Sequence, residues 1–159
     1  VISSKAPAKF ALRIRKPDWA VSVQASLPYR EEQGFLIFEQ VWKPETVLTI
    51  GFDAALVVKE TVNKEVYFES GPWVLCHEIA GRQTITKNYS IPGFRESVYA
   101  PVGISVWLYD SDGVNPAAGR LNTYTVKMIN SATGQKEELQ LVPMARTILR
   151  QVSFKRKSP

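Results

Sequence analysis

The sequence predicts an all-β fold, an antiparallel β-sandwich of the jelly-roll or immunoglobulin-like kind, on three observations. About ten short segments are rich in aromatic and β-branched residues. Gly, Pro, Asn and Asp separate them at the spacing of sandwich strands. No segment has a convincing amphipathic helical period. The 159 residues suit a single domain, and the alternative is a main sandwich of residues 1–109 with a smaller β unit of residues 110–159.

The first half of the chain contains the clearest strands. In FALRIR, residues 10–15, apolar residues alternate with Ala and Arg, which predicts a half-buried strand that ends at the turn KPDW. AVSVQA follows, and GFLIFEQVW, residues 34–42, is apolar on both faces, as a strand covered on both sides would be. KPE then turns the chain into TVLTIGF. Three further strands are predicted at ALVVKET, EVYFES and WVLCHEI.

The second half mixes strands with longer polar segments. TKNYSIPGFRES, residues 86–97, is rich in turn-forming residues and is predicted to be a loop. Strands are predicted at VGISVWLY, NTYTVKMIN, EELQLVP and RQVSFK. The connection DSDGVNPAAGRL, residues 110–121, is where the chain would divide if it forms two units. PMARTILRQV fits a helical period, but its proline start and β-branched finish weaken that interpretation.

The composition argues against several classes of protein. One cysteine excludes an intrachain disulfide framework and a zinc site built from several cysteines. The apolar runs are far shorter than the ~20 residues of a membrane-spanning helix, so no membrane partner is expected. The net charge of +5 comes largely from the two ends; because Arg13 and Arg15 alternate with apolar residues, a solvated strand face is favoured over nucleic-acid binding. A first residue Val1 leads us to expect a piece of a longer polypeptide.

The only cysteine, Cys76, stands next to the only histidine, His77, in the segment GPWVLCHE. Successive side chains of a strand leave on opposite faces, so the sheet would separate the thiol from the imidazole. A nucleophile and its base need hydrogen-bond reach, which adjacent strand positions do not give. We therefore expect Cys76 to be a buried, unreactive thiol and His77 to be structural or on the surface.

No pair of carboxylates is singled out as a glycosidase would require. Of the fifteen acidic residues, Glu69 and Glu78 are the most notable, because each interrupts or closes an apolar strand next to SGPW. A strand-edge carboxylate paired with an arginine is favoured over a catalytic one. No catalytic residue is assigned to this chain.

Aromatic residues are the candidates for contact with a carbohydrate. The residues assigned to this role are Trp107, Tyr109 and Trp73. Trp107 shares its predicted strand face with small residues and is expected to be more exposed than Trp42 or Trp73. The opposing interpretation is that all of these rings belong to a core.

Two polar motifs favour ordinary structural interpretations. In DSDGVN, Asp110, Asp112 and Asn115 faintly resemble a calcium loop, but the glycine is misplaced and Leu121 stands where a bidentate glutamate should be. A turn is therefore favoured, and neither a metal nor a cofactor is expected. The triplet NYS at Asn88 is a glycosylation sequon that matters only in a host that glycosylates.

Three segments together resemble a non-catalytic, β-rich region of glycoside hydrolase family 127, the β-L-arabinofuranosidase-like family. FALRIRKPDWA, Phe10 to Ala20, is similar to the family segment L-R-I-P-x-W-A, with Lys16 and Asp18 flanking the proline. GFLIFEQVWKPETVLTIGF is similar to a glycine-aromatic strand, a Trp-Lys turn and a second strand. ESGPWVLCHE is similar to G-P-L-V-Y-x-x-E, with Trp73 in the leucine position. LVPMARTILRQVSFK is a weaker match to the end of these proteins.

The resemblance implies that catalysis belongs to an upstream α/α barrel of the same polypeptide, which carries a cysteine nucleophile and a zinc site. None of those motifs occurs in this sequence, and Cys76 aligns with a strand of the β-rich region. The expected function is a non-catalytic accessory domain of a bacterial glycoside hydrolase that supports the barrel and lines its cleft. The parent protein is expected to be periplasmic or secreted, and this chain alone is not expected to be an enzyme. A carbohydrate-binding β-sandwich module is the alternative.

Overall fold

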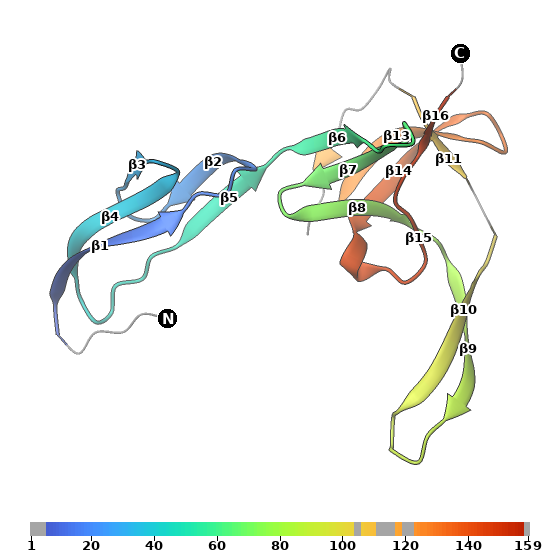
Figure 1. Ribbon diagram of the computed structural model, residues 1–159, viewed down its shortest axis with the longest axis horizontal. Coiled ribbons are helices and arrows are strands. Elements are labelled where there is room, and N and C mark those ends of the chain that lie inside the picture. Colours follow the sequence, from blue (N-terminus) through green and yellow to red (C-terminus); the bar gives the residue numbers. More distant parts are fainter. Residues whose placement is uncertain (1–5, 104–105, 111–116, 119–122, 158–159) are drawn as a thin grey trace. The chain divides into compact units, whose positions relative to one another are not determined.

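The chain is described by a computed structural model for residues 6–103, 106–110, 117–118 and 123–157. Within these residues the regular elements are the strands β1 to β16 and one short 3-10 turn, η2 (Met144–Arg146) (Figure 1). The all-β prediction is confirmed. The chain divides into two compact units, Val1–Ala55 and Leu56–Pro159.

The first unit is built from two small antiparallel sheets that share one core. Its strands are β1 (Ala8–Arg15), β2 (Ala20–Ala25), β3 (Arg30–Glu32), β4 (Phe35–Trp42) and β5 (Ile50–Ala54). One sheet has the order β1-β4-β3 and the other pairs β2 with β5. Leu36, Phe38 and Trp42 of β4 are buried in a cluster that includes Val23 of β2 and Phe52 of β5. Apolar residues from both sheets therefore face each other.

The first half of β4 is covered on both faces, as the run GFLIFEQVW predicts, whereas Glu39 and Val41 in its second half are exposed. Leu36, Ile37 and Phe38 are all buried although they alternate between the two faces. Ile37 lies opposite Arg13 of β1 and Arg30 of β3, and the long apolar stems of arginines can cover a neighbouring side chain. On the same face the Arg13 guanidinium lies over the Phe35 ring, 5.1 Å from its centroid, so a basic side chain covers part of this apolar surface.

The second unit contains a curled, mixed sheet. Its strands are β6 (Leu56–Glu60), β7 (Val66–Ser70), β8 (Trp73–Glu78), β11 (Trp107–Tyr109), β12 (Ala117–Ala118), β13 (Tyr124–Asn130), β14 (Lys136–Pro143), β15 (Arg150–Gln151) and β16 (Lys155–Arg156). The main path is β16-β11-β13-β14-β8-β7-β6, while β12 pairs with β13 and β15 with β8. The β11–β16 pair is parallel and the other pairs are antiparallel.

The two ends of this path approach each other. Phe154, just before β16, exchanges two backbone hydrogen bonds with Val66 of β7, at 2.8 and 2.9 Å. Arg156 of β16 forms an ion pair of 2.9 Å with Glu60 of β6. The sheet therefore curls around a core, whose buried members are Val66, Phe68, Leu75, Trp107, Tyr109, Tyr124, Val126, Met128, Leu139, Leu141 and Phe154.

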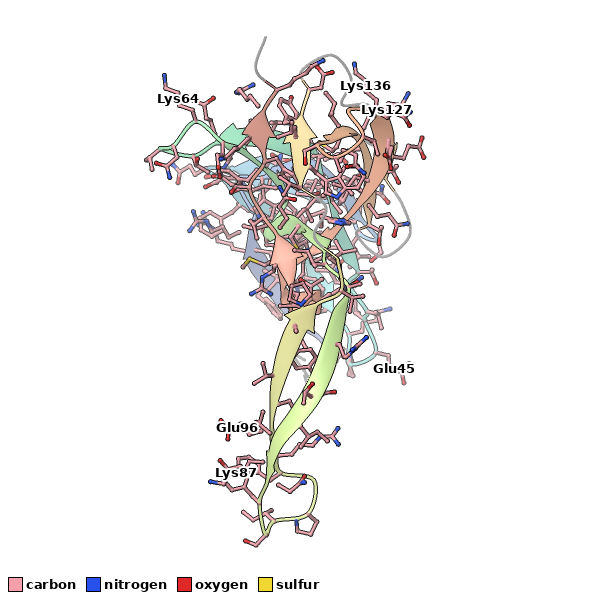
Figure 2. The ribbon with its side chains drawn as sticks, turned by 90° about the vertical axis from the view of Figure 1, so that its right-hand side faces the viewer. Glu45, Lys64, Lys87, Glu96, Lys127 and Lys136 are labelled. Atoms are coloured by element: carbon pink, nitrogen blue, oxygen red, sulfur yellow. The ribbon has the colours of Figure 1, made fainter. Side chains whose placement is uncertain are left out.

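A two-stranded hairpin leaves the curled sheet between β8 and β11. Strands β9 (Gly81–Asn88) and β10 (Arg95–Pro101) pair with each other and, within the described residues, with no other strand (Figure 1). Figure 2 shows Lys87 and Glu96 on this hairpin. The predicted loop over residues 86–97 is wrong: it is the outer half of a hairpin. Residues of β9 are exposed along its whole length, so the sequence lacks the apolar alternation that marks a half-buried strand.

The boundary between the units follows Ala55, whereas the alternative division from the sequence was placed between residues 109 and 110. On the C-terminal side of that position, β13 and β16 pair directly with β11 in one sheet. Most of the connection 110–121 lies outside the described residues. PMARTILRQV is not an α-helix: it contains only the short turn η2, then a bend at Ile148 and Leu149, and then β15.

Candidate functional site

Cys76 is buried in β8, as predicted. Its side chain has 0% exposure, and its sulfur lies 3.3 Å from the Thr147 hydroxyl. Burial raises the pKa of the Cys76 thiol, and the hydrogen bond with Thr147 offsets part of this shift. A thiol that is both covered and held in its neutral form is a poor nucleophile.

His77 points to a different environment from Cys76. Its ring meets the Trp107 ring edge to face, with centroids 5.8 Å apart, and its Nδ1 lies 3.5 Å from the Gln140 carbonyl oxygen. The Gln151 amide brackets the Trp107 backbone, accepting from its N–H at 3.3 Å and donating to its carbonyl at 3.2 Å. His77 therefore belongs to a packed aromatic contact, and its neighbours differ from those of Cys76.

The two singled-out carboxylates lie on different strands and have different surroundings. Glu69 on β7 forms an ion pair of 2.5 Å with Lys59 of β6, and this contact raises the pKa of Lys59. The partner is a lysine, where an arginine was expected. Glu78 is exposed at the end of β8, opposite Arg150 of β15 in the register. Nothing in this arrangement brings the two carboxylates together across a cleft.

The expected exposure of Trp107 is wrong. Trp107 is 7% exposed and Tyr109 is also buried, and both lie in the core of the curled sheet. Strand β11 is flanked by β13 and β16, and Phe68 from β7 packs edge to face against Tyr109 with centroids 6.1 Å apart. The small residues before Trp107 do not predict its burial, because the strands that bury it are distant in the sequence. The Trp107 Nε1 atom is buried and has no hydrogen-bond partner among the described residues.

Trp73 is the most exposed of the three tryptophans compared in the sequence. It is 42% exposed at the start of β8, whereas Trp42 and Trp107 are buried. Trp42 stacks on Phe10 with centroids 5.5 Å apart and donates its Nε1 hydrogen to the Phe10 carbonyl at 3.1 Å. Of the three residues assigned to carbohydrate contact, only Trp73 therefore presents its ring to solvent.

Metal ligands do not gather in the part of the chain that the structure describes: no three His, Cys, Asp or Glu side chains are placed to hold an ion. Asp110 lies 2.7 Å from Lys136, which neutralises its charge. Asp112 and Asn115 of the DSDGVN motif lie outside the described residues. A hollow of about 380 Å³ is lined by Lys43, Pro44, Glu45 and Thr46 of one surface turn (Figure 2 labels Glu45), so it lacks converging polar groups from separate elements.

Comparison of the chain with protein-family models, curated proteins and solved structures finds no match. The resemblance to family 127 rests on its sequence segments alone. None of the helices within the described residues has the length and apolar character needed to span a bilayer.

The feature that the sequence did not predict is the hairpin of β9 and β10 with its exposed apolar side chains. Ile85, Val98, Ile91 and Phe94 are exposed on its strands and tip. The turn is encoded by IPGF: the Phe94 N–H donates to the Ile91 carbonyl at 3.1 Å, and Gly93 has φ +79°. A proline followed by a glycine with positive φ is the signature of a type II turn, so the tip was readable from the sequence even though the strands were not.

Proposed function

We propose that this chain is a non-catalytic accessory domain of a β-L-arabinofuranosidase-like glycoside hydrolase. It covers and orients an upstream catalytic barrel of the same polypeptide and lines one rim of its cleft. The support is the order of the segments that resemble family 127. They correspond to β1 with its following turn, to β4 and β5, and to β7 and β8.

The observation that carries the proposal is the burial of Cys76 at 0% exposure with a raised thiol pKa. Cys76 is the only cysteine of the sequence. Because its thiol is buried, this chain has no accessible thiolate that could act as the cysteine nucleophile of the family's barrel does. Glu69 is likewise held in an ion pair with Lys59. Cys76 and Glu69 are therefore both engaged in contacts within the sheet, which suits a scaffold.

The finer fold assignment also belongs to this proposal. We propose an antiparallel sandwich for the first unit, supported by the cluster in which β4 packs against Val23 and Phe52 of the second sheet. The jelly-roll or immunoglobulin-like topology, predicted from the sequence for the chain as a whole, stays a prediction. The curled sheet of the second unit would then be a separate β body attached to this sandwich.

Carbohydrate binding is the second candidate function, and the exposed ring of Trp73 favours it. Sugars stack their apolar faces on exposed aromatic rings, and Trp73 lies at the rim of β8 next to the turn at Gly71. A single exposed ring gives weak binding, because affinity requires several converging contacts. The scaffold is therefore the preferred function.

The test compares the complete polypeptide that contains this segment with a version that lacks residues 1–159. We expect deletion to lower the melting temperature of the barrel and its hydrolysis of β-L-arabinofuranosides, while this chain alone shows no turnover. The matched variants are Glu69→Gln and Glu78→Gln, which keep side-chain size and remove charge. Turnover by the isolated chain that either variant abolishes would refute the scaffold and favour an independent enzyme.

A further inference from the structure

The hairpin of β9 and β10 is the one long element of the second unit that lacks a covering partner within the described residues. A two-stranded hairpin is marginally stable in water unless another strand or layer supports it. Its base is fixed: the Val102 N–H donates to the Ala80 carbonyl at 2.8 Å, and Gly81 is so close to Leu149 that an added Cβ would stand 2.7 Å from its Cδ1. The free length beyond this base is what needs a partner.

No strand of the described part of the chain pairs with the outer edge of β10, which leaves it open for backbone pairing. The hydrogen-bonded pairs of an antiparallel ladder alternate, and Val102 is bonded to Ala80, so Val98 bonds inward to Thr84. Ser97 and Tyr99 then direct their N–H and C=O groups outward. Pro101 occupies an outward position as well, where a missing N–H costs the hairpin nothing.

The edge of β9 is less suitable for pairing. The register shifts near Glu96 and Ser97, so β9 carries an extra residue that interrupts its line of outward groups. Arg82 and Lys87 add positive charge to the same strand. Bulges protect edge strands from pairing, and the bulge lies on β9, whereas β10 runs without an extra residue and is uncharged from Ser97 to Ala100.

We propose that β10 pairs with β10 of a second copy of this chain, antiparallel about a two-fold axis at Val98, so that two hairpins form one four-stranded sheet. This register pairs all seven residues of β10, with Ser97 opposite Tyr99 of the second copy. Arg95 and Glu96 meet Pro101 and Ala100, so no like charges are opposed. Moving the axis to Glu96 would oppose two glutamates and shorten the ladder.

Exposed apolar side chains match in the same register. Val98, 56% exposed, lies opposite Val98 of the second copy. Continued beyond the strand, the register brings Phe94, 60% exposed, opposite Val102, 57% exposed, on each side of the axis. The hairpin tip of one copy is thereby placed against the hairpin base of the other. Charge, backbone polarity and apolar area are therefore all satisfied when the partner is a second copy.

The first test is the mass of the full chain in solution as a function of concentration, measured by sedimentation or light scattering. We expect a dimer that dissociates on dilution, because an interface of two edge strands falls at the small end of protein interfaces. Val98→Lys should give a monomer, since it places two ammonium groups next to the axis. Thr84→Lys is the matched control: Thr84 is opposite Val98 on the same face but one strand further from the axis, and its dimer should persist.

A charge exchange separates loss of pairing from loss of folding. Val98→Lys and Val98→Glu should each be monomeric alone and should form a mixed dimer when combined. A second measurement uses Val98→Cys, because opposite residues of a non-hydrogen-bonded pair have Cα atoms about 4.5 Å apart, within disulfide range. Thr84→Cys places the thiols three strand spacings apart, about 14 Å, which a disulfide cannot span. Cys76 is buried and does not interfere.

Three results would overturn the proposal. A chain that stays monomeric at its highest soluble concentration would mean that the edge of β10 serves a strand of a different protein or none. A dimer that is unaffected by Val98→Lys would mean that the contact lies elsewhere. Equal oxidation of Val98→Cys and Thr84→Cys would rule out the axis at Val98.

Discussion

The burial of Cys76 makes a quantitative prediction for the Cys76→Ala variant. Alanine keeps the Cβ atom and deletes one sulfur from a site with 0% exposure. Removal of one buried methylene-sized group, as in Ile→Val, costs about 0.5–1.5 kcal/mol. The Thr147 hydroxyl keeps a partner, because it also donates to the Met144 carbonyl at 3.3 Å, so no unsatisfied group adds to this cost. We therefore expect a loss of about 1 kcal/mol in the free energy of unfolding.

Two assays check this prediction. Urea unfolding followed by circular dichroism gives the stability difference between the two proteins. A thiol reagent under native conditions gives the protection of Cys76: if labelling requires global unfolding worth about 5 kcal/mol, it should be at least ~1,000-fold slower than in urea. The control is Thr84→Cys in the Cys76→Ala background, whose only thiol lies on the exposed hairpin. Labelling of native Cys76 within about tenfold of that control would refute the burial argument.

Three further predictions follow from the core and from the exposed tryptophan. Burial raises the pKa of Cys76, so the stability advantage over Cys76→Ala should be complete below about pH 8.5 and fall as the pH rises, measured by urea unfolding at pH 7 and pH 10. Tyr124→Phe should lower the free energy of unfolding by about 1–3 kcal/mol, because it leaves the buried Ser70 hydroxyl without its hydrogen-bond partner. Urea unfolding should show a smaller loss when Tyr124→Phe is made in a Ser70→Ala background. Oligosaccharides such as arabinan should leave the melting temperature unchanged; a saturable shift that Trp73→Ala removes would favour the glycan module.

The strands that could be predicted from the sequence are those with a local pattern. FALRIR alternates because one face of β1 turns toward the core, where Leu12 and Ile14 pack on the buried cluster of β4. The run from Phe35 to Phe38 is continuously apolar because the first half of β4 is covered on both faces, with Leu36, Ile37 and Phe38 all buried. In WVLCHE the apolar run likewise marks a strand with both Leu75 and Cys76 buried. In these three strands the local hydrophobic pattern therefore predicted both the element and its buried residues.

The errors arose where distant residues decide the outcome. Trp107 follows small residues, and the groups that contact it are distant in the sequence: the His77 ring packs against its ring, and the Gln151 amide bonds its backbone. No local pattern records these contacts. The prediction missed the hairpin for the opposite reason. Both faces of β9 are exposed to solvent, so its sequence shows no alternation of apolar and polar residues.

The hairpin also contains apolar residues that burial in a core of this chain does not account for. The apolar residues of the curled sheet are used in its core, and Cys76 and Glu69 are used in structural contacts. Phe94 packs against Tyr89 within the hairpin, with ring centroids 5.2 Å apart, but it stays 60% exposed, and Val98 is 56% exposed. Exposed apolar residues on an open strand edge carry a risk of non-specific association. A defined partner removes that risk by covering the edge. The interaction surface of this domain is therefore best sought on β10, whether or not the chain supports a catalytic barrel.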